Sequence, residues 1–320
     1  MRRRTLIAGL LLLPIDVPAR AQALPRISIL HSGFPQRTPI DHLIEALQSL
    51  GYADGRTAKI EVLGGEADPK RLQSFVTRLV AERPEVIIAL TSPAVRALKQ
   101  ADVSSPVVFA FVTDPVGSGI VKSLSHPGGN FTGVTYSDAA IGGKRLGLLL
   151  EALPGTHRVA VMWSRAIEEF TAIVSAIRQA AEAARVEIIS AEINGLQDLA
   201  PAFDHIDQSA AQALIFLSDN LMFGHRREVA ALEIEHRLPS IHSFPPEVVD
   251  GALMSYGPDV DENYRRAAAL AARVLKGEHP GELPVEEPTR FSLHINLKTA
   301  RALNLTLPPT LLAQADEVIE

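Results

Sequence analysis

Short apolar runs rich in valine and isoleucine alternate with longer amphipathic segments along this chain. The segments between the runs repeat apolar residues every three or four positions, as in Ile40, Leu43 and Leu47, which is typical of amphipathic helices. Because the short runs are apolar throughout, we expect parallel strands covered by helices on both faces. In the first part of the chain the pattern predicts strands over residues 27–30, 60–63, 86–90, 107–112 and 131–134.

The same pattern begins again near Val159. It predicts further strands over residues 159–163, 186–189 and 214–217, at 241, and over 253–254. Two successive series of this kind predict an α/β fold with two Rossmann-like, doubly wound lobes. A chain of 320 residues is also too long for one small core.

The expected lobes are not continuous in sequence. We expect residues 24–136 to form the first lobe and 137–257 the second. Residues 258–320 should supply a return helix that completes the first lobe, a hinge crossing and a C-terminal segment. Crossings are expected near 135–137, near 255–258 and before Phe291.

The N-terminal 23 residues have the pattern of a secretory signal peptide. Three arginines precede an apolar run over residues 6–13, and a small-residue A-x-A pattern follows. That run is far below the ~20 residues needed to span a bilayer. Pro14 and Pro18 argue against the alternative, a buried N-terminal helix. The sequence therefore predicts export to a periplasm, with cleavage after Ala21 or Ala23.

Composition narrows the possible functions. The chain has no cysteine, which excludes a lipid-anchored cysteine, disulfides, thiolate metal sites and cysteine nucleophiles. It has 31 basic and 37 acidic residues, and since four arginines and one aspartate fall within residues 1–23, the remainder has a net charge near −9. A nucleic-acid partner is therefore not expected.

Polar residues follow most of the predicted strands. Ligands of open parallel sheets bind beyond the carboxyl ends of the strands, so these residues form the candidate site. Hydroxyls, carboxylates and aromatic rings on two facing edges suit a small amphiphilic ligand in a cleft. The candidates are Ser32, Gly33, Phe34, Thr91, Ser92, Thr113, Asp114, Thr135 and Tyr136 in the first lobe, and Ser164, Ser218, Asp219, Asn220, His242 and Tyr256 in the second.

Three of these candidates have further or alternative roles. Asp114 precedes a proline, so helix capping is an alternative to ligand contact. Asp219 could instead bond within its own loop. Thr91 precedes a predicted helix start, where the N–H groups of Ala94 and Val95 could face an anion.

Catalytic templates are absent or incomplete. Residues 142–145 (GGKR) resemble the end of a phosphate loop but lack its first glycine and its Ser or Thr. No G-x-S-x-G or H-E-x-x-H pattern occurs, and the histidines are scattered. We therefore predict a binding protein without enzymatic activity, cofactor or metal.

Four segments resemble a known family. They are residues 107–115 (VVFAFVTDP), 123–135 (SLSHPGGNFTGVT) and 252–257 (ALMSYG), and the tail from Leu283. Through these segments the chain resembles ABC transporter substrate-binding proteins related to the tryptophan/tyrosine-binding type, from about Arg26 to Glu320. That resemblance implies a type I periplasmic-binding-protein fold, with three crossovers and hinge closure on the ligand.

The resemblance also implies site roles and a partner. Ser218-Asp219-Asn220 matches a segment whose acid binds the ligand amine, although the family has threonine at the first position. Thr91-Ser92-Pro93 matches the segment that holds the ligand carboxylate. We expect a monomeric periplasmic receptor that delivers an amino acid or an aromatic or organic acid to an ABC permease in the inner membrane. A ligand-sensing module for a membrane sensor or chemoreceptor is the alternative, since the fold permits both.

Overall fold

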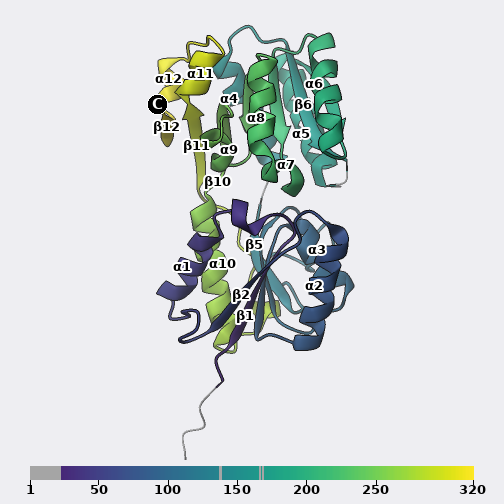
Figure 1. Ribbon diagram of the computed structural model, residues 1–320, viewed down its shortest axis with the longest axis vertical. Helices are drawn as coiled ribbons and strands as arrows, with labels where there is room; N and C mark the ends of the chain where they lie inside the picture. The colour runs from purple at the N-terminus through teal and green to yellow at the C-terminus, as the bar shows by residue number, and fades with distance from the viewer. Residues whose placement is uncertain (1–22, 137–138, 166, 168) are drawn as a thin grey trace, which may run out of the picture.

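The computed structural model describes residues 23–136, 139–165, 167 and 169–320, which form two lobes stacked along the long axis (Figure 1). Apart from Ala23, the predicted signal peptide lies outside the described residues. Within the part of the chain that the structure describes, no helix combines the length and apolar character needed to cross a membrane.

The first lobe is built on a five-stranded sheet of order β2-β1-β3-β4-β5 in which every pair is parallel. Its strands are β1 (Arg26–His31), β2 (Lys59–Gly64), β3 (Val86–Leu90), β4 (Val107–Val112) and β5 (Phe131–Thr135). Its helices before the first crossing are η1 (Pro35–Arg37), α1 (Ile40–Ser49), α2 (Pro69–Glu82) and α3 (Ser92–Gln100).

The second lobe has a seven-stranded sheet of order β12-β11-β10-β9-β8-β6-β7. All its pairs are parallel except that between β10 and β11. Its strands are β6 (Arg158–Ser164), β7 (Glu187–Ile193), β8 (Ala213–Leu217), β9 (Ser240–His242), β10 (Met254–Pro258), β11 (Phe291–Asn296) and β12 (Glu317–Ile319). Its helices are α4 (Ala139–Ala152), α5 (Glu169–Ala184), η2 (Leu196–Asp198), α6 (Leu199–Gln208), α7 (Asn220–Gly224), α8 (Arg226–Glu235), α9 (Pro245–Val249), α11 (Leu297–Ala302) and α12 (Pro309–Leu312).

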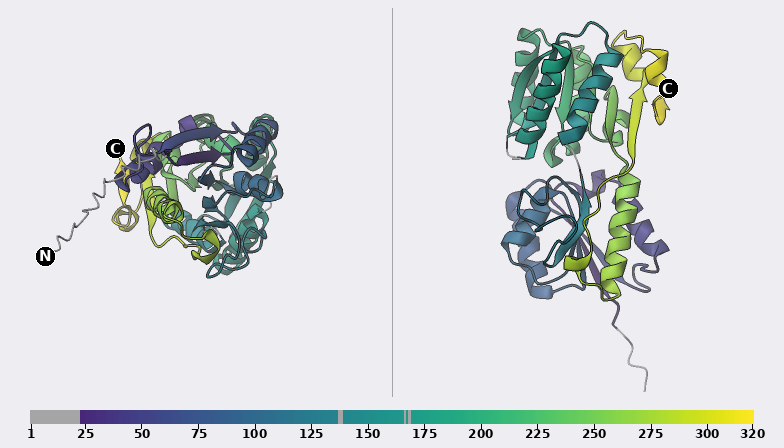
Figure 2. Two further views of the ribbon diagram at one scale, coloured as in Figure 1. Left: turned by 90° about the horizontal axis from the view of Figure 1, so that it is seen from below. Right: turned by 180° about the vertical axis from the view of Figure 1, so that it is seen from behind.

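The chain passes between the two sheets at three places: from β5 to α4, from β10 to α10 (Val260–Leu275), and from η3 (Pro280–Glu282) to β11. Figure 2 shows α10 lying along the first lobe before the chain returns to the second. On this return path Glu286 borders β5, where its carbonyl accepts the N–H of Thr135 at 2.8 Å.

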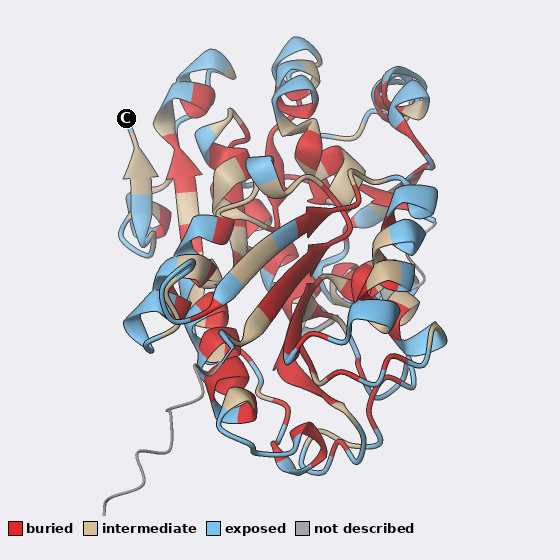
Figure 3. Ribbon diagram, turned by 60° about the horizontal axis from the view of Figure 1, so that its bottom comes forward, coloured by how far each residue is buried: buried red, intermediate tan, exposed pale blue. Residues whose placement is uncertain are grey.

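The central strands of each sheet are buried on both faces, as the continuous apolar runs predict, whereas the edge strands β2, β7 and β12 are partly exposed (Figure 3). In the first lobe, Ile27 and Ile29 of β1 belong to a core shared with α1 and α10, whereas Leu30 belongs to a second core shared with α2 and α3. The second lobe is likewise packed on both sides of its sheet. The predicted fold of two doubly wound lobes is confirmed. The tail strands β11 and β12 had not been predicted, and the antiparallel β11 departs from the expected parallel pairing.

The structure explains why position 133, within the segment 123–135, is a glycine. Gly133 of β5 pairs with Phe109 of β4 at the edge of the first sheet. A Cβ at position 133 would lie 2.2 Å from the carbonyl oxygen of Phe109, far inside van der Waals contact. Only glycine therefore allows β5 to approach β4 this closely.

We expect Gly133→Ala to lower the free energy of unfolding by about 1 to 3 kcal/mol, because a backbone oxygen has no rotamer by which to avoid the new methyl group. The matched control is Gly147→Ala in α4, where a Cβ meets nothing within 4 Å. That exposed helical site should gain about 0.5 to 1 kcal/mol. Urea denaturation measures both changes, and an unchanged stability of Gly133→Ala would contradict the close approach of β4 and β5.

Candidate functional site

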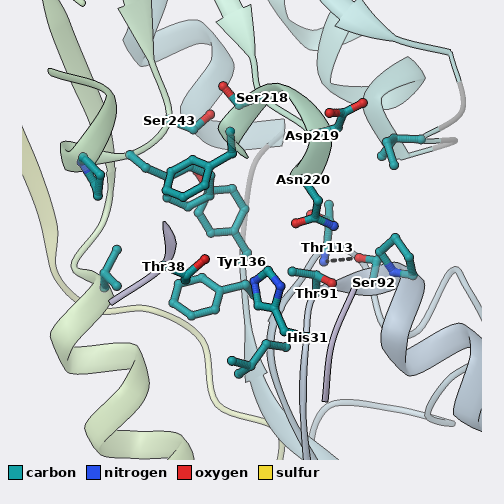
Figure 4. Close-up of a pocket in the computed structure, with 18 of the residues that line it drawn as sticks. His31, Thr38, Thr91, Ser92, Thr113, Tyr136, Ser218, Asp219, Asn220 and Ser243 are labelled. Carbon is teal, nitrogen blue, oxygen red and sulfur yellow. Dashed lines mark hydrogen bonds between the residues drawn. The ribbon is translucent and has the colours of Figure 1, made fainter. Parts of the chain in front are cut away.

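A cavity of about 130 Å³ lies between the two lobes, at the carboxyl ends of strands from both sheets. Most of the cavity wall is apolar and includes several aromatic rings. Its polar lining residues are His31, Thr38, Thr91, Ser92, Thr113, Tyr136, Ser218, Asp219, Asn220 and Ser243 (Figure 4), together with Tyr264 of α10. A mostly apolar cleft with a few convergent polar groups is the usual form of a small-molecule site.

Strand register brings the first-lobe groups together. β1 and β3 are parallel neighbours that pair His31 with Leu90, so the residues that follow, Ser32 and Thr91, lie side by side. Their hydroxyl oxygens are 2.7 Å apart. Thr91 has φ +86°, in a region that a β-branched residue rarely adopts. Such backbone strain is concentrated at functional sites.

The start of α3 offers fewer donors than the sequence suggested. The N–H of Val95 donates to the carbonyl of Thr91 at 3.3 Å, because the helix ladder begins there. The expectation that Val95 presents a free N–H to an anion is therefore wrong. Ser92 still lines the cavity, and its hydroxyl accepts the N–H of Thr113 at 3.4 Å.

In the second lobe, Asp219 caps α7. Its carboxylate accepts the N–H of Met222 at 2.8 Å, and it also bonds with the hydroxyl of Ser164 and the N–H of Leu221. Burial raises the pKa of Asp219 above its usual value although these hydrogen bonds oppose the rise. In Figure 4 the carboxylate points back toward its own lobe. The predicted local bonding of this loop is thus present, at a residue that also lines the cavity.

The two lobes touch directly beside the cavity. Asn220 donates its side-chain N–H to the hydroxyl of Ser32 at 2.6 Å. Nearby, the ring of Phe34 covers Gly224, where a Cβ would lie 2.5 Å from that ring, and meets His225 edge-on. Gly33 also lies close to the other lobe, since a Cβ at this position would lie 2.9 Å from the Cβ of Asn220.

Aromatic rings from both lobes form one wall of the cavity. Phe111 packs edge-on against Tyr264 of α10, with ring centroids 5.1 Å apart, and against Phe244 of the second lobe at 6.4 Å. Tyr136, at the first crossing, lies 5.5 Å from Phe244. Phe111 has φ +58° and sits where the pairing of β4 with β5 shifts register. This bulge turns the Phe111 ring out of the sheet and into the cavity wall.

A buried ion cluster supports the second-lobe wall. His242 lies between two carboxylates, with Nε2 at 2.7 Å from Glu233 and Nδ1 at 3.0 Å from Glu247. Burial alone would lower the pKa of His242, but the charges and hydrogen bonds of the two glutamates outweigh it and raise the pKa to about 10. Glu247 also accepts the hydroxyl of Ser218 and the N–H of Phe244, so the cluster holds two cavity residues in place.

The structure brings about half of the predicted site residues to the cavity. Ser32 and Ser164 contact lining residues, and Gly33 and Phe34 lie at the contact between the lobes. The seven predicted residues that line the cavity are Thr91, Ser92, Thr113, Tyr136, Ser218, Asp219 and Asn220.

The other four predicted residues lie elsewhere. Asp114 accepts the N–H of Gly117 at 2.8 Å within a turn, and since no helix begins there, the helix cap given as its alternative is not formed. Thr135 is buried at the end of β5, and His242 lies behind the wall, held by its two glutamates. Tyr256 stacks on Phe291 of the antiparallel strand β11.

The prediction missed several lining residues. The polar ones are His31, Thr38, Ser243 and Tyr264, of which His31 and Ser243 directly neighbour predicted residues along the chain. Among residues 23–136, 139–165, 167 and 169–320, no group of three or more metal-ligating side chains is found.

The chain matches a known protein family over most of its length. A family model described as "ABC transporter substrate binding protein" matches residues 33–319. The chain belongs to this family. The resemblance drawn from the sequence and the type I periplasmic-binding-protein fold are both confirmed.

Individual relatives are more distant. The "Tyrosine-binding protein" of Clostridioides difficile (strain R20291) is 29% identical over 262 residues, which cover 82% of this chain and 75% of the relative. A conserved domain protein from Vibrio cholerae has a TM-score of 0.86 at 24% identity, covering 92% of this chain and 99% of that one. An ABC domain in complex with L-Trp from Streptococcus pneumonia has a TM-score of 0.84 at 24% identity, covering 93% and 100%.

The ion cluster predicts a pH dependence of stability. The folded-state pKa of His242, about 10, lies above the 6.5 of an unfolded chain. Its contribution to the free energy of unfolding is therefore complete below pH 6.5, declines as the pH rises from there, and is gone above about pH 10. We expect His242→Gln to cost about 3 to 5 kcal/mol near pH 6.5, because two buried carboxylates lose their cation.

Denaturation at several pH values between 6.5 and 10 measures this effect, and the gap between His242→Gln and the unchanged protein should narrow as the pH rises. Arg273→Gln is the control. It breaks the exposed pair of Arg273 with Glu278, which solvent screens, and should leave the free energy of unfolding nearly unchanged. A gap for His242→Gln that stays constant over this range would rule out a buried His242 cation.

Proposed function

We propose that this protein is the receptor of an ABC importer and that it captures an amino acid, or a related aromatic or organic acid, in the interlobe cavity without chemistry. The observation that carries the proposal is the cavity's division between the lobes. Uncharged donors line the first lobe, a carboxylate lies in the second, and aromatic rings form one wall. A zwitterion with an apolar side chain complements all three.

Charge placement gives the ligand an orientation. The ligand carboxylate lies against the first lobe, where the hydroxyls of Thr91 and Ser92 are located. The amine lies toward the second lobe and Asp219, which the cap bonds and Ser164 hold in place. The names of the relatives support an amino acid: one is called tyrosine-binding, and one structure holds L-Trp.

Closure of the lobes around the ligand is part of the proposal. The contacts between Asn220 and Ser32, and between Phe34 and Gly224, join residues that belong to different lobes. Opening would break these contacts without disturbing either core. Export to the periplasm by residues 1–23 and delivery to an inner-membrane permease complete the proposed role.

Removing the charge of Asp219 tests the amine assignment. Asp219→Asn keeps an acceptor for the N–H of Met222, so the α7 cap survives while the charge is lost. We expect an amino acid to bind thirtyfold or more weakly, since an unpaired buried charge costs about 2 to 5 kcal/mol. Thr91→Ala should cost only about 0.5 to 1.5 kcal/mol, because neighbouring donors remain.

Calorimetry with the tightest binder found among L-tyrosine, L-tryptophan and the other amino acids measures both effects. Propionate analogues that lack the amine are the control, and they should not distinguish Asp219→Asn from the unchanged protein. Equal affinity of an amino acid for Asp219→Asn and the unchanged protein refutes the amine assignment.

A second variant tests closure. In Gly224→Ala the new methyl group would lie 2.5 Å from the ring of Phe34, which belongs to the other lobe. The clash arises only when the lobes meet, so ligand affinity should fall roughly fivefold to a hundredfold, equivalent to about 1 to 3 kcal/mol. The melting temperature without ligand should not change.

Phe34→Ala combined with Gly224→Ala removes the clash and should restore much of the lost affinity. X-ray scattering measures closure directly. Ligand should make the unchanged protein more compact, and the same change should be smaller in Gly224→Ala. If Gly224→Ala binds ligand as tightly as the unchanged protein, closure by this contact is wrong.

A further inference from the structure

His31 is a cavity residue for which the proposed site provides no role. It is the last residue of β1, lines the cavity and is only 5% exposed. Its Nδ1 accepts the backbone N–H of Gly33 at 2.8 Å. A nitrogen that accepts a hydrogen bond carries no proton, so the neutral ring has its proton on Nε2.

The ring is neutral under ordinary conditions. Burial lowers the pKa of His31 to about 4, well below that of an exposed histidine. Of the described residues that line the cavity, His31 is the only basic side chain. The first-lobe wall therefore presents Nε2–H as an uncharged donor.

This donor is available to a ligand. Nε2 has no hydrogen-bond partner among the residues whose placement is described. Figure 4 shows the ring rising from the end of β1 beside Thr91 and below Tyr136, among the lining side chains. Among the described residues, Nε2 of His31 is not one of the fully enclosed polar atoms without a partner, so it is open to the cavity, where a ligand acceptor could reach it.

The neighbours of His31 define what it can bind. β1 and β3 pair His31 with Leu90, so the ring lies next to Thr91 and Ser92 at the start of α3. With the N–H of Val95 bonded within its helix, an imidazole N–H would add a donor to the hydroxyls that could face an anion here. An amine cannot take this position, since Nδ1 is already occupied and Nε2–H cannot accept a hydrogen bond.

We infer that His31 is a specificity-determining residue, whose Nε2–H donates a hydrogen bond to the carboxylate of the ligand. The inference deepens the proposed function and rests on it, because it assumes that an amino acid binds in this cavity. It makes the carboxylate the group by which the first lobe selects its ligand. Amides and esters of the same molecule should bind more weakly, since a bond to a charged acceptor is the stronger one.

Two substitutions separate the two nitrogens of the ring. His31→Asn places its amide oxygen near the Nδ1 position, where it still accepts the N–H of Gly33, but it has no donor at the Nε2 position. His31→Gln places its amide N–H near Nε2. Calorimetry on both variants should use L-tyrosine with L-tyrosinamide, and L-tryptophan with L-tryptophanamide, as matched probes.

We expect the unchanged protein and His31→Gln to prefer the acid to its amide by a similar factor. In His31→Asn that preference should shrink about tenfold or more, the size expected for one hydrogen bond to a charged group. A purely structural defect would weaken acid and amide equally and leave the ratio unchanged. The melting temperature without ligand checks that each variant is folded.

The outcomes separate this inference from the proposed function. An undiminished preference for the acid in His31→Asn overturns the role of His31 and leaves the amino-acid receptor standing. Failure of the unchanged protein to bind any amino acid overturns the proposed function, and the role of His31 with it. A reduced preference in His31→Asn with retention in His31→Gln supports both.

Discussion

Parallel strand pairing is the constraint on which the site depends. When all strands of a sheet run the same way, every loop after a carboxyl end opens on the same edge. The register of β1 with β3 thus places Ser32 against Thr91, although 59 residues separate them. In the second lobe, β6 and β8 pair in the same way, which brings Ser164 to Asp219. Both walls of the cavity follow from backbone pairing before any ligand is considered.

The two walls are fixed by different means. In the second lobe, buried charge does the positioning: Glu247 accepts bonds from Ser218, Phe244 and His242, and such a cluster is tolerated only when every member is paired. In the first lobe, the backbone positions the side chains, because Thr91 and Phe111 have positive φ angles. Groups held in this manner lose little freedom on binding, which lowers the entropy cost of capturing a small ligand.

The sequence predicted the parts of this structure that have a local signal. Apolar runs marked the strands, and the polar residues after them include Thr91, Ser92 and Asp219, which line the cavity. Phe111 was missed because it lies inside a continuous apolar run, and nothing in that run signals a bulge.

Other predicted site residues lie outside the cavity lining because their environment depends on distant parts of the chain. His242 follows the same strand-end rule as Asp219. It lies behind the wall because α8 and α9 supply Glu233 and Glu247 as its partners. Likewise, Tyr256 stacks on Phe291 of β11 and does not line the cavity. The sequence pattern did not predict β11, which pairs antiparallel with β10. The hydrophobic pattern of the sequence predicts which residues are buried. Side-chain contacts between distant elements decide which of the polar residues point toward the cavity.

The aromatic wall explains how a cavity of modest volume links binding to the arrangement of the lobes. Its rings come from three sources: Phe111 and Tyr264 in the first lobe, Tyr136 at the crossing, and Phe223 and Phe244 in the second lobe. Edge-on contacts among them form a continuous surface only where the lobes meet. An apolar ligand side chain would therefore bury its full area only in the closed arrangement. A ligand shifts an equilibrium only by its differential affinity for the two states. In the proposed closure, this shared wall would supply the preference for the closed state that the polar groups of either lobe alone lack.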